Sequence, residues 1–499
     1  MTKVAVITVP RIEPHRPPAG AAIIAAVCEK LNFNVTGLDL NIEFFNQNKK
    51  DYYDYDAIWD ETASPRLAQD QVIDNFIKQN ANEIITQNFD FLLISIFGAP
   101  GRYFTKRFLE YIRPLFSGKI IAGGMGVEYS GLGSNIDCFG EILRKNNLLD
   151  DYITGEGEIA LINYFNGRKG PGINNSDYIQ SDELDSLPWP EYKYFQLEKY
   201  DYLDQPHKEV FITGSRGCVR RCGYCDIEKY WPKFRYRSGQ NIANEIIKHY
   251  EEHGITKFYF TDSLINGSKI AFTDMCEKLA NYKFDIPIRW GGQFIFRRRY
   301  NVTDEHFAMI KEAGGDEFFV GFETGSDRLR FEMGKKFTNE DIDYQLEQFS
   351  KNKLKVMPLM FTGYVTETLQ DHQETLSIFK RWQRYVADGT ITGIELGAQL
   401  IILPGSPVER MISTHGIEFM QDNDGIPVNN LWQAKANPEL TIKERVRRKL
   451  ELHEEAMKYH WPVWRQTSRL DDLKKLILKY DLHTTNKKTF FPIPVVSST

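Results

Sequence analysis

Short apolar segments alternate with helical segments along most of this chain, and this alternation restricts the fold more than any other feature. In the first part, five apolar segments are typical of strands, at residues 4–9, 34–40, 91–97, 119–122 and 152–154. Helices are predicted between them, at residues 19–30, 70–86, 102–115 and 137–147. Strands that alternate with helices form parallel, doubly wound sheets whose ligand crevice lies at the carboxyl ends of the strands. Residues 1–166 are therefore predicted to be an α/β domain with a Rossmann-like sheet.

The alternation returns after a change in composition. Residues 167–207 are rich in Gly, Asn, Asp, Ser and Pro, which predicts a linker. Six strands are then expected at residues 210–213, 258–261, 288–291, 317–322, 356–361 and 393–402. Helices are expected at residues 240–253, 269–281, 304–313, 339–351 and 369–387. These units predict a partial (βα)6 barrel over residues 208–410, followed by a small helical C-terminal region, residues 411–499, whose clearest amphipathic run is 443–459.

Composition places the chain among globular proteins and disfavours two classes of partner. Its 499 residues are 42% hydrophobic and 26% charged, and a chain of this length is expected to form two or three domains. The formal net charge of -6 provides no basic field for nucleic acid or an anionic membrane. No stretch is apolar enough to span a bilayer and the N-terminus resembles no secretory signal, so a cytoplasmic location is expected.

Three of the six cysteines, Cys218, Cys222 and Cys225, lie within eight residues, directly after the first predicted barrel strand. Their spacing is C-x3-C-x2-C, with no fourth cysteine nearby. Three thiolates can hold three irons of a [4Fe-4S] cluster, and the fourth iron then keeps an open position for a chelating ligand. The amino and carboxylate groups of S-adenosylmethionine (SAM) suit that position, so the spacing predicts a catalytic metal site.

A structural zinc site is the alternative interpretation of these cysteines. His249 and His253 have the H-x3-H spacing of a zinc finger. However, the gap between Cys225 and His249 is longer than the usual finger spacer, and a finger would leave Cys218 without a role. The two histidines also fall on a helix that the barrel pattern already explains. The sequence therefore favours the cluster over zinc.

With Tyr224 directly before its third cysteine, the loop resembles that of the radical SAM superfamily. The resemblance is to the branch with an N-terminal cobalamin-binding domain, and it extends from about residue 3 to residue 410. It implies that Cys218, Cys222 and Cys225 ligate the cluster, and that the backbone of Tyr224 lies near the SAM adenine.

Further segments resemble SAM-binding motifs of the same family. Residues 260–263 end the second barrel strand, residues 290–293 end the third, and the G-x-E-x-G-S segment 321–326 ends the fourth. The strand ends of a barrel meet at one mouth, where active sites form. The resemblance implies SAM-binding roles for Asp262, Gln293, Gly321, Glu323 and Ser326.

In the first domain, five residues in the turns after the strands resemble those that line the nucleotide loop and corrin edge of cobalamin. They are Ser95, Gly123, Gly124, Gly155 and Glu156. The Asp-x-His-x-x-Gly motif that supplies a cobalt-ligating histidine in many cobalamin proteins is absent, which argues against ligation by histidine. The alternative is that this domain binds no cobalamin and only supports the barrel.

Three hypotheses for function follow. The first is a cobalamin-dependent radical SAM C-methyltransferase with a [4Fe-4S] cluster, SAM and cobalamin as cofactors, and with flavodoxin or ferredoxin as electron donor. The second is a radical SAM enzyme that catalyses a rearrangement or cyclisation without methyl transfer. A second cluster, as in sulfur insertion, is not expected because Cys28, Cys138 and Cys276 are far apart in the sequence. The third is a non-enzymatic, zinc-stabilised scaffold. The substrate, a small molecule or a peptide, cannot be read from the sequence.

Overall fold

The computed structural model forms two compact units. The first contains residues 1–212 and 245–257, and the second contains residues 213–244 and 258–499. The residues described are 1–10, 12–50, 52, 67–128, 137–167, 173–174, 181–421, 427–464, 474 and 491–492.

A six-stranded sheet forms the centre of the first unit, with the order β2-β1-β3-β4-β5-β6. Its strands are β1 (Lys3–Thr8), β2 (Asn34–Asp39), β3 (Phe91–Ser95), β4 (Lys119–Gly123), β5 (Asp151–Thr154) and β6 (Ile173–Asn174). All its paired strands run parallel, and the register aligns Thr8 with Ser95 and Ser95 with Gly123 at the carboxyl edge. The predicted doubly wound sheet is confirmed.

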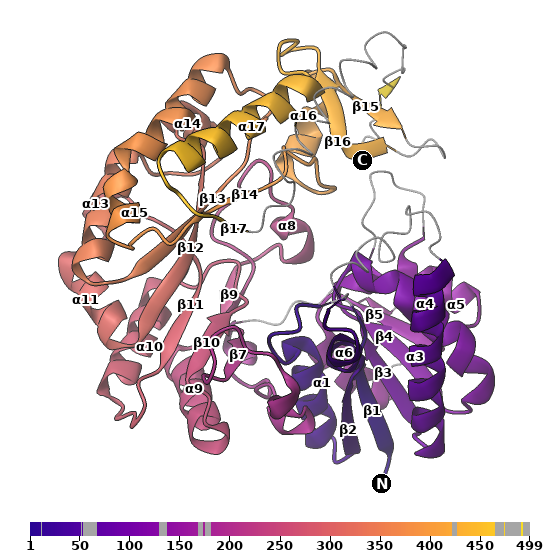
Figure 1. Ribbon diagram of the computed structural model, residues 1–499. Helices are drawn as coiled ribbons and strands as arrows, with labels where there is room; N and C mark the ends of the chain where they lie inside the picture. The colour runs from indigo at the N-terminus through magenta and orange to yellow at the C-terminus, as the bar shows by residue number, and fades with distance from the viewer. Residues whose placement is uncertain are drawn as a thin grey trace. The chain divides into compact units, whose positions relative to one another are not determined.

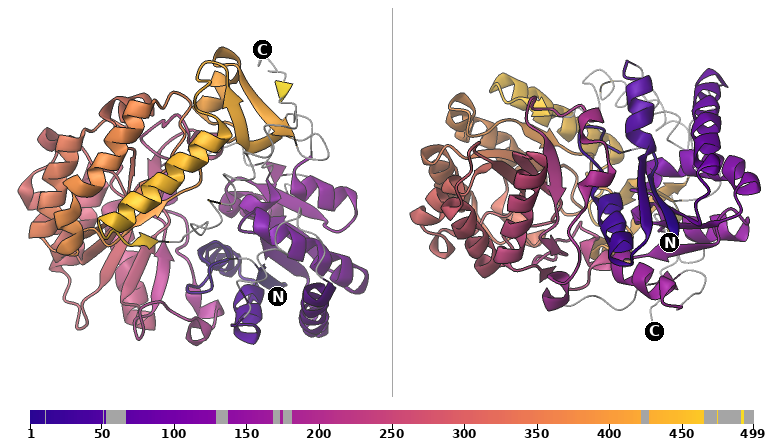
Figure 2. Two further views of the ribbon diagram at one scale, coloured as in Figure 1. Left: turned by 45° about the horizontal axis from the view of Figure 1, so that its top comes forward. Right: turned by 90° about the horizontal axis from the view of Figure 1, so that it is seen from below.

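Helices cover both faces of this sheet (Figures 1 and 2). They are α1 (Ala19–Lys30), α2 (Leu40–Gln47), α3 (Leu67–Thr86), α4 (Arg102–Ile112), α5 (Phe139–Lys145) and α6 (Gly157–Phe165). Phe104, Phe108 and Ile112 of α4 recur every four residues, and all three are buried in the core. The helix predicted at residues 102–115 ends at Ile112, because Pro114 cannot continue it and a 3-10 turn, Arg113–Leu115, follows.

The described residues of the segment predicted to be a linker, 167, 173–174 and 181–207, belong to the first unit, and 173–174 form the sixth strand of its sheet, β6. The segment also contains α7 (Ser181–Leu184) and two 3-10 turns, Tyr192–Tyr194 and Leu197–Lys199. The buried Tyr200 hydroxyl donates a hydrogen bond to Asp39 at 2.7 Å. Burial raises the pKa of Asp39 to about 6, while the hydrogen bond from Tyr200 opposes this rise.

A seven-stranded sheet, in the order β17-β14-β13-β12-β11-β10-β7, organises the barrel. Its strands are β7 (Glu209–Ile212), β10 (Lys257–Phe260), β11 (Arg289–Phe294), β12 (Gly315–Glu323), β13 (Lys355–Met360), β14 (Ile394–Leu396) and β17 (Val463–Trp464). The six predicted strands are present, and β17 adds a seventh parallel to β14. The strand predicted at residues 393–402 is too long, because after Leu396 the backbone leaves the ladder: Ile402 N–H donates to the Asn429 carbonyl.

The helices of the second sheet follow its strands in the βα order. They are α8 (Ile227–Tyr230), α9 (Gly239–His253), α10 (Lys269–Asn281), α11 (Asp304–Glu312), α12 (Asp327–Glu332), α13 (Asn339–Lys351), α14 (Leu369–Arg381), α15 (Gln383–Ala387), α16 (Met411–Thr414) and α17 (Ile442–Lys458). Capping boxes begin two of them, Thr338 with Asp341 for α13 and Thr368 with Asp371 for α14. None of the described helices is both long and apolar enough to cross a membrane.

The C-terminal region predicted to be helical contains a helix and also a small sheet. The predicted run 443–459 is the helix α17, which lies beside α14 in Figures 1 and 2. Before it, β15 (Ile417–Gln421) and β16 (Pro427–Ala434) form an antiparallel sheet with β18 (Phe491–Pro492). The physical reason is an alternating pattern, in which Ile417 and Phe419 are buried on either side of Glu418. Residues 465–473 and 475–480 of the expected helix lie outside the described residues.

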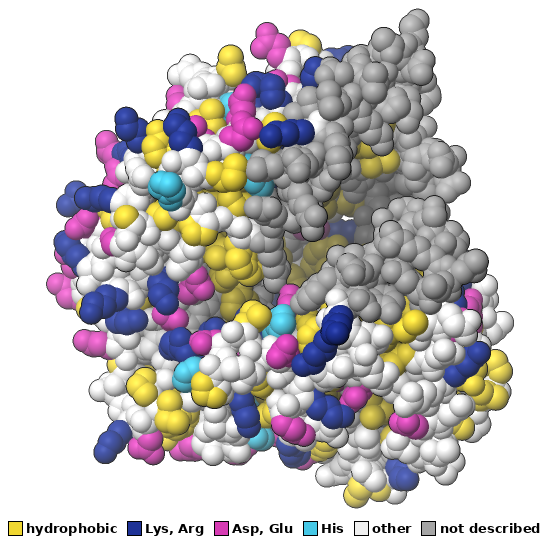
Figure 3. All heavy atoms as spheres, in the orientation of Figure 1, with side chains coloured by type: hydrophobic (Ala, Val, Ile, Leu, Met, Phe, Trp, Pro, Cys, Tyr) yellow, Lys and Arg dark blue, Asp and Glu magenta, His cyan; other side chains and the backbone are white. Residues whose placement is uncertain are grey.

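Charges are mixed on the face of the molecule in Figure 3. Lys and Arg side chains (dark blue) are interspersed with Asp and Glu side chains (magenta) over the helices of the second unit.

Phe349 of α13 tests the core of the second unit. Its side chain is fully buried, and its ring lies 5.3 Å from that of Phe296 and 5.8 Å from that of Phe318, between ring centroids. We expect Phe349→Ala to lower the free energy of unfolding by about 3–5 kcal/mol, because the cavity left behind cannot collapse fully. The control Ile270→Ala removes a side chain that is 75% exposed, and should cost less than about 0.5 kcal/mol. Urea denaturation of both variants makes the comparison, and equal losses would contradict the assignment of this core.

Candidate functional site

The three clustered cysteines lie in a loop, residues 217–234, that we call the cysteine loop. It is closed at its base by two short antiparallel strands, β8 (Ser215–Arg216) and β9 (Arg235–Tyr236). The loop follows β7, so it begins at the carboxyl end of a barrel strand, as the sequence predicts. A tight turn, with a hydrogen bond of 3.1 Å from the Cys225 N–H to the Cys222 carbonyl, brings these two cysteines together.

Backbone hydrogen bonds attach the turn at Gly223 to two other segments. The Gly223 N–H donates to the Met333 carbonyl at 2.9 Å, and the Gly223 carbonyl accepts from Val408 at 2.7 Å. The Tyr364 hydroxyl occupies the remaining side, because a Cβ on residue 223 would lie 2.4 Å from it. Only glycine leaves room for this contact, so the position of the turn is decided by the barrel around it.

The thiols of Cys218, Cys222 and Cys225 lie near enough to one another to interact electrostatically. Burial is the main reason that the pKa of Cys225 is raised to about 11, and the neighbouring Cys222 and Cys218 contribute to this rise. Burial also raises the pKa of Cys222, while the Lys335 ammonium lowers it. A metal ion deprotonates the thiol that coordinates it, so buried thiols with a raised pKa suit metal ligation better than free thiol chemistry.

The set of donors fits a [4Fe-4S] cluster by its chemistry. It offers three thiols on one loop and a nearby ammonium that can offset the negative charge of a thiolate-bound cluster. No group of three or more His, Cys, Asp or Glu side chains within the described ranges is already arranged around one metal position. The cysteine side chains would therefore turn toward a common centre when they hold a cluster.

His249 and His253, the histidines of the zinc alternative, are engaged within the first unit. The His249 ring is fully buried and lies 5.2 Å from the Tyr192 ring and 6.0 Å from the His253 ring, between centroids. Glu245, also fully buried, lies 3.7 Å from its Nε2 atom. Both histidines are therefore accounted for by packing on the buried face of α9, without a metal ion.

Glu323, at the end of β12, joins the cysteine loop to the barrel. Its Oε1 atom accepts a hydrogen bond of 2.6 Å from the Tyr224 hydroxyl and lies 2.8 Å from the Lys335 Nζ atom. The two side chains of this ion pair are only 12% and 9% exposed. Burial opposes the charge on Lys335, but Glu323 together with Cys222 and Cys218 raises its pKa, so the ammonium is charged. The backbone of Glu323 is left-handed, with φ +63°, an unusual conformation that often marks functional sites.

The other residues implied in SAM binding have definite structural roles. Asp262 is buried, with its pKa raised to about 6 by burial, and accepts hydrogen bonds from the Gly214 N–H at 2.8 Å and the Ser215 hydroxyl at 2.5 Å. Ser326 is fully buried; its hydroxyl caps α12 and donates to Asp371 at 2.6 Å. Both side chains shape the turns at strand ends, whereas Gln293 is half-buried at the end of β11.

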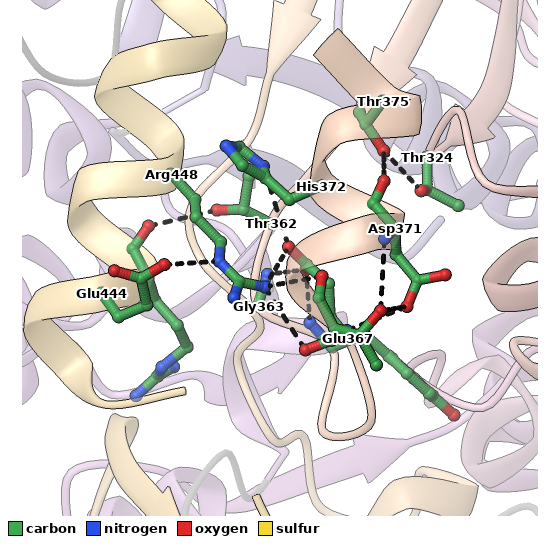
Figure 4. Close-up of polar contacts among 12 residues, drawn as sticks. Thr324, Thr362, Gly363, Glu367, Asp371, His372, Thr375, Glu444 and Arg448 are labelled. Atoms are coloured by element: carbon green, nitrogen blue, oxygen red, sulfur yellow. Dashed lines mark hydrogen bonds and ion pairs between the residues drawn. The ribbon is translucent and has the colours of Figure 1, made fainter. Parts of the chain in front are cut away.

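A buried polar network connects α17 to the same mouth (Figure 4). Arg448 lies between Glu444 and Glu367, at 2.9 Å from each. Glu367 in turn accepts hydrogen bonds from the backbone N–H groups of Gly363 at 2.5 Å and Tyr364 at 3.3 Å. Since Tyr364 packs against the cysteine loop, the C-terminal helix helps to position a loop more than 200 residues before it in the chain.

The first unit contains a mostly apolar cavity of about 160 Å³ at the carboxyl edge of its sheet. Four residues that the sequence predicts for cobalamin line it, namely Ser95, Gly123, Gly124 and Gly155. Gly123 is one of the lining residues, and a Cβ there would make only an ordinary contact, 3.7 Å from the Ile153 carbonyl oxygen.

Some lining residues differ from the prediction. Glu156 is not among them, whereas Glu158 is. Helix α1 contributes Gly20, Ile23 and Ile24, which the sequence reasoning missed. The signal that could have found them is the run of small residues at the start of α1, which lets a ligand approach the helix closely. Lys335 was also missed, although it follows the G-x-E-x-G-S segment by only nine residues.

Comparison with models of known protein families identifies the class of the barrel domain. Residues 212–378, which include the cysteine loop and strands β10 to β13, match the radical SAM superfamily, so this part of the chain is a radical SAM domain.

Two curated relatives extend the likeness. A cytidylyl-2-hydroxyethylphosphonate methyltransferase of Streptomyces wedmorensis is 24% identical over 483 residues, which covers 85% of each chain. An anaerobic magnesium-protoporphyrin IX monomethyl ester cyclase of Rubrivivax gelatinosus is 23% identical over 271 residues. That alignment covers 50% of this chain and 48% of the cyclase, so the match spans about half of the cyclase's length.

Among solved structures, the chain is similar to the radical SAM methyltransferase TsrM of Kitasatospora setae, solved with cobalamin and a [4Fe-4S] cluster bound. The TM-score is 0.63 at 14% identity, and the match covers 96% of both chains. At this identity the likeness confirms the fold, in which a Rossmann-like sheet precedes a partial barrel.

Glu323→Gln tests the link between the cysteine loop and the barrel. The substitution leaves the Lys335 ammonium buried without its counter-charge, so we expect the free energy of unfolding to fall by about 3 kcal/mol. The control Glu347→Gln breaks an exposed pair with Arg384 and should cost less than about 1 kcal/mol. Urea denaturation followed by tryptophan fluorescence measures both. Losses of the same size would mean that the Glu323–Lys335 pair contributes no more than a surface contact.

Proposed function

We propose that this protein is a cobalamin-dependent radical SAM methyltransferase. The observation that carries the proposal is the cysteine loop, which follows β7 at the carboxyl end of a barrel strand and whose Cys218 and Cys222 interact electrostatically with Lys335. When bound, the [4Fe-4S] cluster supplies the electron that cleaves SAM to a 5′-deoxyadenosyl radical, and cobalamin supplies the methyl group.

The residues of the barrel then have separate tasks. Cys218, Cys222 and Cys225 hold the cluster. Tyr224 and Glu323 hold each other by a hydrogen bond of 2.6 Å, which orients the backbone of the loop toward SAM. The charged Lys335 offsets negative charge near the thiolates. Asp262, Gln293, Gly321 and Ser326 shape the strand ends that would surround SAM.

In the first unit, the glycine-lined cavity would receive the nucleotide end of cobalamin. Gly123 in its lining carries no side chain that would narrow the cavity. His15 would not ligate cobalt, because its Nδ1 atom lies 2.6 Å from the Asp201 carbonyl oxygen and its Nε2 atom 3.0 Å from Glu13. This agrees with the missing Asp-x-His-x-x-Gly motif.

The partners follow from the same chemistry. Reduction of the cluster requires a one-electron donor such as flavodoxin or ferredoxin. All six cysteines are free thiols, which suits a reducing compartment such as the cytoplasm. A small-molecule substrate is favoured by the relative from Streptomyces wedmorensis, which is named for a small phosphonate.

A second candidate is a radical SAM enzyme that closes a ring without methyl transfer. The observation that favours it is the similarity to the magnesium-protoporphyrin cyclase, which covers half of this chain. The products separate the two candidates: methyl transfer together with SAM cleavage supports the first, and 5′-deoxyadenosine without a methylated product supports the second.

Anaerobic reconstitution of Cys222→Ala tests the cluster. We expect the wild-type protein to be brown, to contain about four irons per chain, and to cleave SAM to 5′-deoxyadenosine, because all three thiolates are needed to hold the cubane. The variant should lose the iron, the absorbance and the cleavage. Cys276→Ala, which removes a buried thiol of α10, serves as the control and should keep all three. A colourless wild-type protein with one zinc would refute the proposal.

Gly123→Val tests the cobalamin cavity. The new side chain would add bulk to the lining of the cavity, and its Cβ would meet no atom closer than 3.7 Å, so the fold should be retained. We expect hydroxocobalamin to bind at least about tenfold more weakly, as measured by equilibrium dialysis. Gly98→Val, at the same edge of the sheet but outside the cavity lining, is the control. Unchanged binding in Gly123→Val would mean that cobalamin does not use this cavity.

A further inference from the structure

The turn that follows α12 lies directly against the backbone of the cysteine loop. The Gly223 N–H donates a hydrogen bond to the Met333 carbonyl at 2.9 Å. A Cβ on Gly334 would lie 2.9 Å from the Arg221 carbonyl oxygen and 3.5 Å from the Cys222 Cα atom. The turn is therefore packed on the backbone of a predicted cluster ligand.

The side chains next to this turn combine an exposed aromatic ring with basic groups. Phe331, near the end of α12, is 39% exposed. The Arg298 guanidinium lies over its ring, with the central carbon 5.4 Å from the ring centroid. The Arg298 Nε atom also donates to the Lys336 carbonyl at 3.2 Å, and Lys336 is itself exposed. These contacts bring two basic residues together beside one exposed ring.

Arg221 adds a third basic side chain, from the cysteine loop itself. Its backbone packs against Gly334, and its side chain is 75% exposed. It pairs with Glu228 at 3.2 Å, but an ion pair in contact with water is weak and is screened further by salt. We call the following four residues the basic patch: Arg221, Arg298, Phe331 and Lys336.

Positive charge exceeds negative charge in the basic patch. Within the described ranges, no carboxylate pairs with Arg298 or Lys336. Glu332, the carboxylate next to Phe331 in the chain, pairs with Arg328 at 2.8 Å. The formal net charge of the whole chain is -6, so the patch is a local exception on a negatively charged protein. A surface with charge of one sign steers partners of the opposite sign toward it.

The composition and the position of the basic patch both suit a transient protein complex. Aromatic residues and arginine are enriched in protein interfaces, and complexes that transfer electrons bury only a small area. Electron transfer slows steeply with distance, so a donor protein must come close to the cluster. The packing of Gly334 on Cys222 places the patch beside a cluster ligand.

We propose that the basic patch is the docking surface for an acidic one-electron carrier protein, such as a flavodoxin or a ferredoxin. Carboxylates of the carrier would face the three basic side chains, which speeds the encounter, and contact with Phe331 would add apolar area. This inference rests on the proposed function, since a radical SAM enzyme needs one electron for its cluster. The carrier is oxidised by one electron and the cluster takes up that electron, with no bond formed or broken.

Stopped-flow reduction of the anaerobically reconstituted full-length protein tests the docking surface. Flavodoxin hydroquinone is the electron donor, and the loss of cluster absorbance gives the rate constant of reduction. We expect Arg221→Glu and Lys336→Glu each to lower this rate constant at least about threefold at low ionic strength, and the double variant at least about tenfold, because attraction becomes repulsion. The matched control is Lys283→Glu, which makes the same charge change on an exposed residue at the amino end of β11. Its rate constant should equal that of the wild type.

Reduced methyl viologen, a small cationic donor, separates docking from damage to the cluster. It should reduce all the variants at least as fast as the wild type, because it needs no protein surface and carries no negative charge. Slower reduction by viologen in the patch variants, unchanged reduction by flavodoxin, or no reduction of the wild type by flavodoxin overturns the proposal.

Ionic strength provides a second test of the same surface. Raising it from about 0.01 M to about 1 M shortens the Debye length from about 30 Å to about 3 Å, and should abolish the difference between the patch variants and the wild type. A difference that persists at high salt is not electrostatic and also overturns the proposal.

The outcomes for the docking surface and for the proposed function can be told apart. A cluster that flavodoxin reduces equally well in all variants, in a protein that transfers methyl groups, removes the docking surface and keeps the proposed function. Reduction that depends on the basic patch, in a protein that forms no methylated product, removes the proposed function and keeps the docking surface.

Discussion

The Oε1 atom of Glu323 is the point on which the barrel mouth depends. It accepts a hydrogen bond from Tyr224 of the cysteine loop and pairs with Lys335, which follows α12. A buried ion pair repays its desolvation only when its geometry is good and its remaining lone pairs are used, and here Tyr224 provides that further hydrogen bond. One carboxylate therefore holds a cluster-binding loop, a barrel strand and a positive charge together.

A second support reaches the loop from the C-terminal side. Arg448 of α17 pairs with Glu367, Glu367 holds the backbone at Tyr364, and Tyr364 packs against Gly223. The loop is thus positioned from β12 and from α17 at once. Such pre-organisation suits an open metal site, because the ligands must keep their places while the fourth coordination position exchanges its occupant.

Local patterns were enough to predict much of this fold. Five strands of the first sheet, β1 to β5, lie on short runs that are mostly apolar, and they were predicted close to their observed ends, whereas the two-residue β6 was predicted to be part of a linker. The predictions were wrong where the local pattern was short, or where contacts with distant residues ended a strand early. The alternating pattern around Phe419 extends over only a few residues. These residues were therefore predicted to belong to a helical region, although they form a β-strand. The sixth barrel strand was predicted too long, because an apolar run does not show where its backbone leaves the ladder.

For the candidate site too, some features could be predicted from the sequence and others could not. The spacing of Cys218, Cys222 and Cys225 was by itself enough to predict a three-thiolate metal loop, since ligand number and spacing are local properties of the chain. Packing decided the rest. The hydroxyl of Ser326 is occupied in capping a helix, Glu158 rather than Glu156 lines the cavity of the first unit, and Lys335 reaches Glu323. The sequence determined which chemistry the loop can support, whereas the tertiary structure alone decided which charges surround it, because electrostatic neighbours come from strands and helices far apart in the chain.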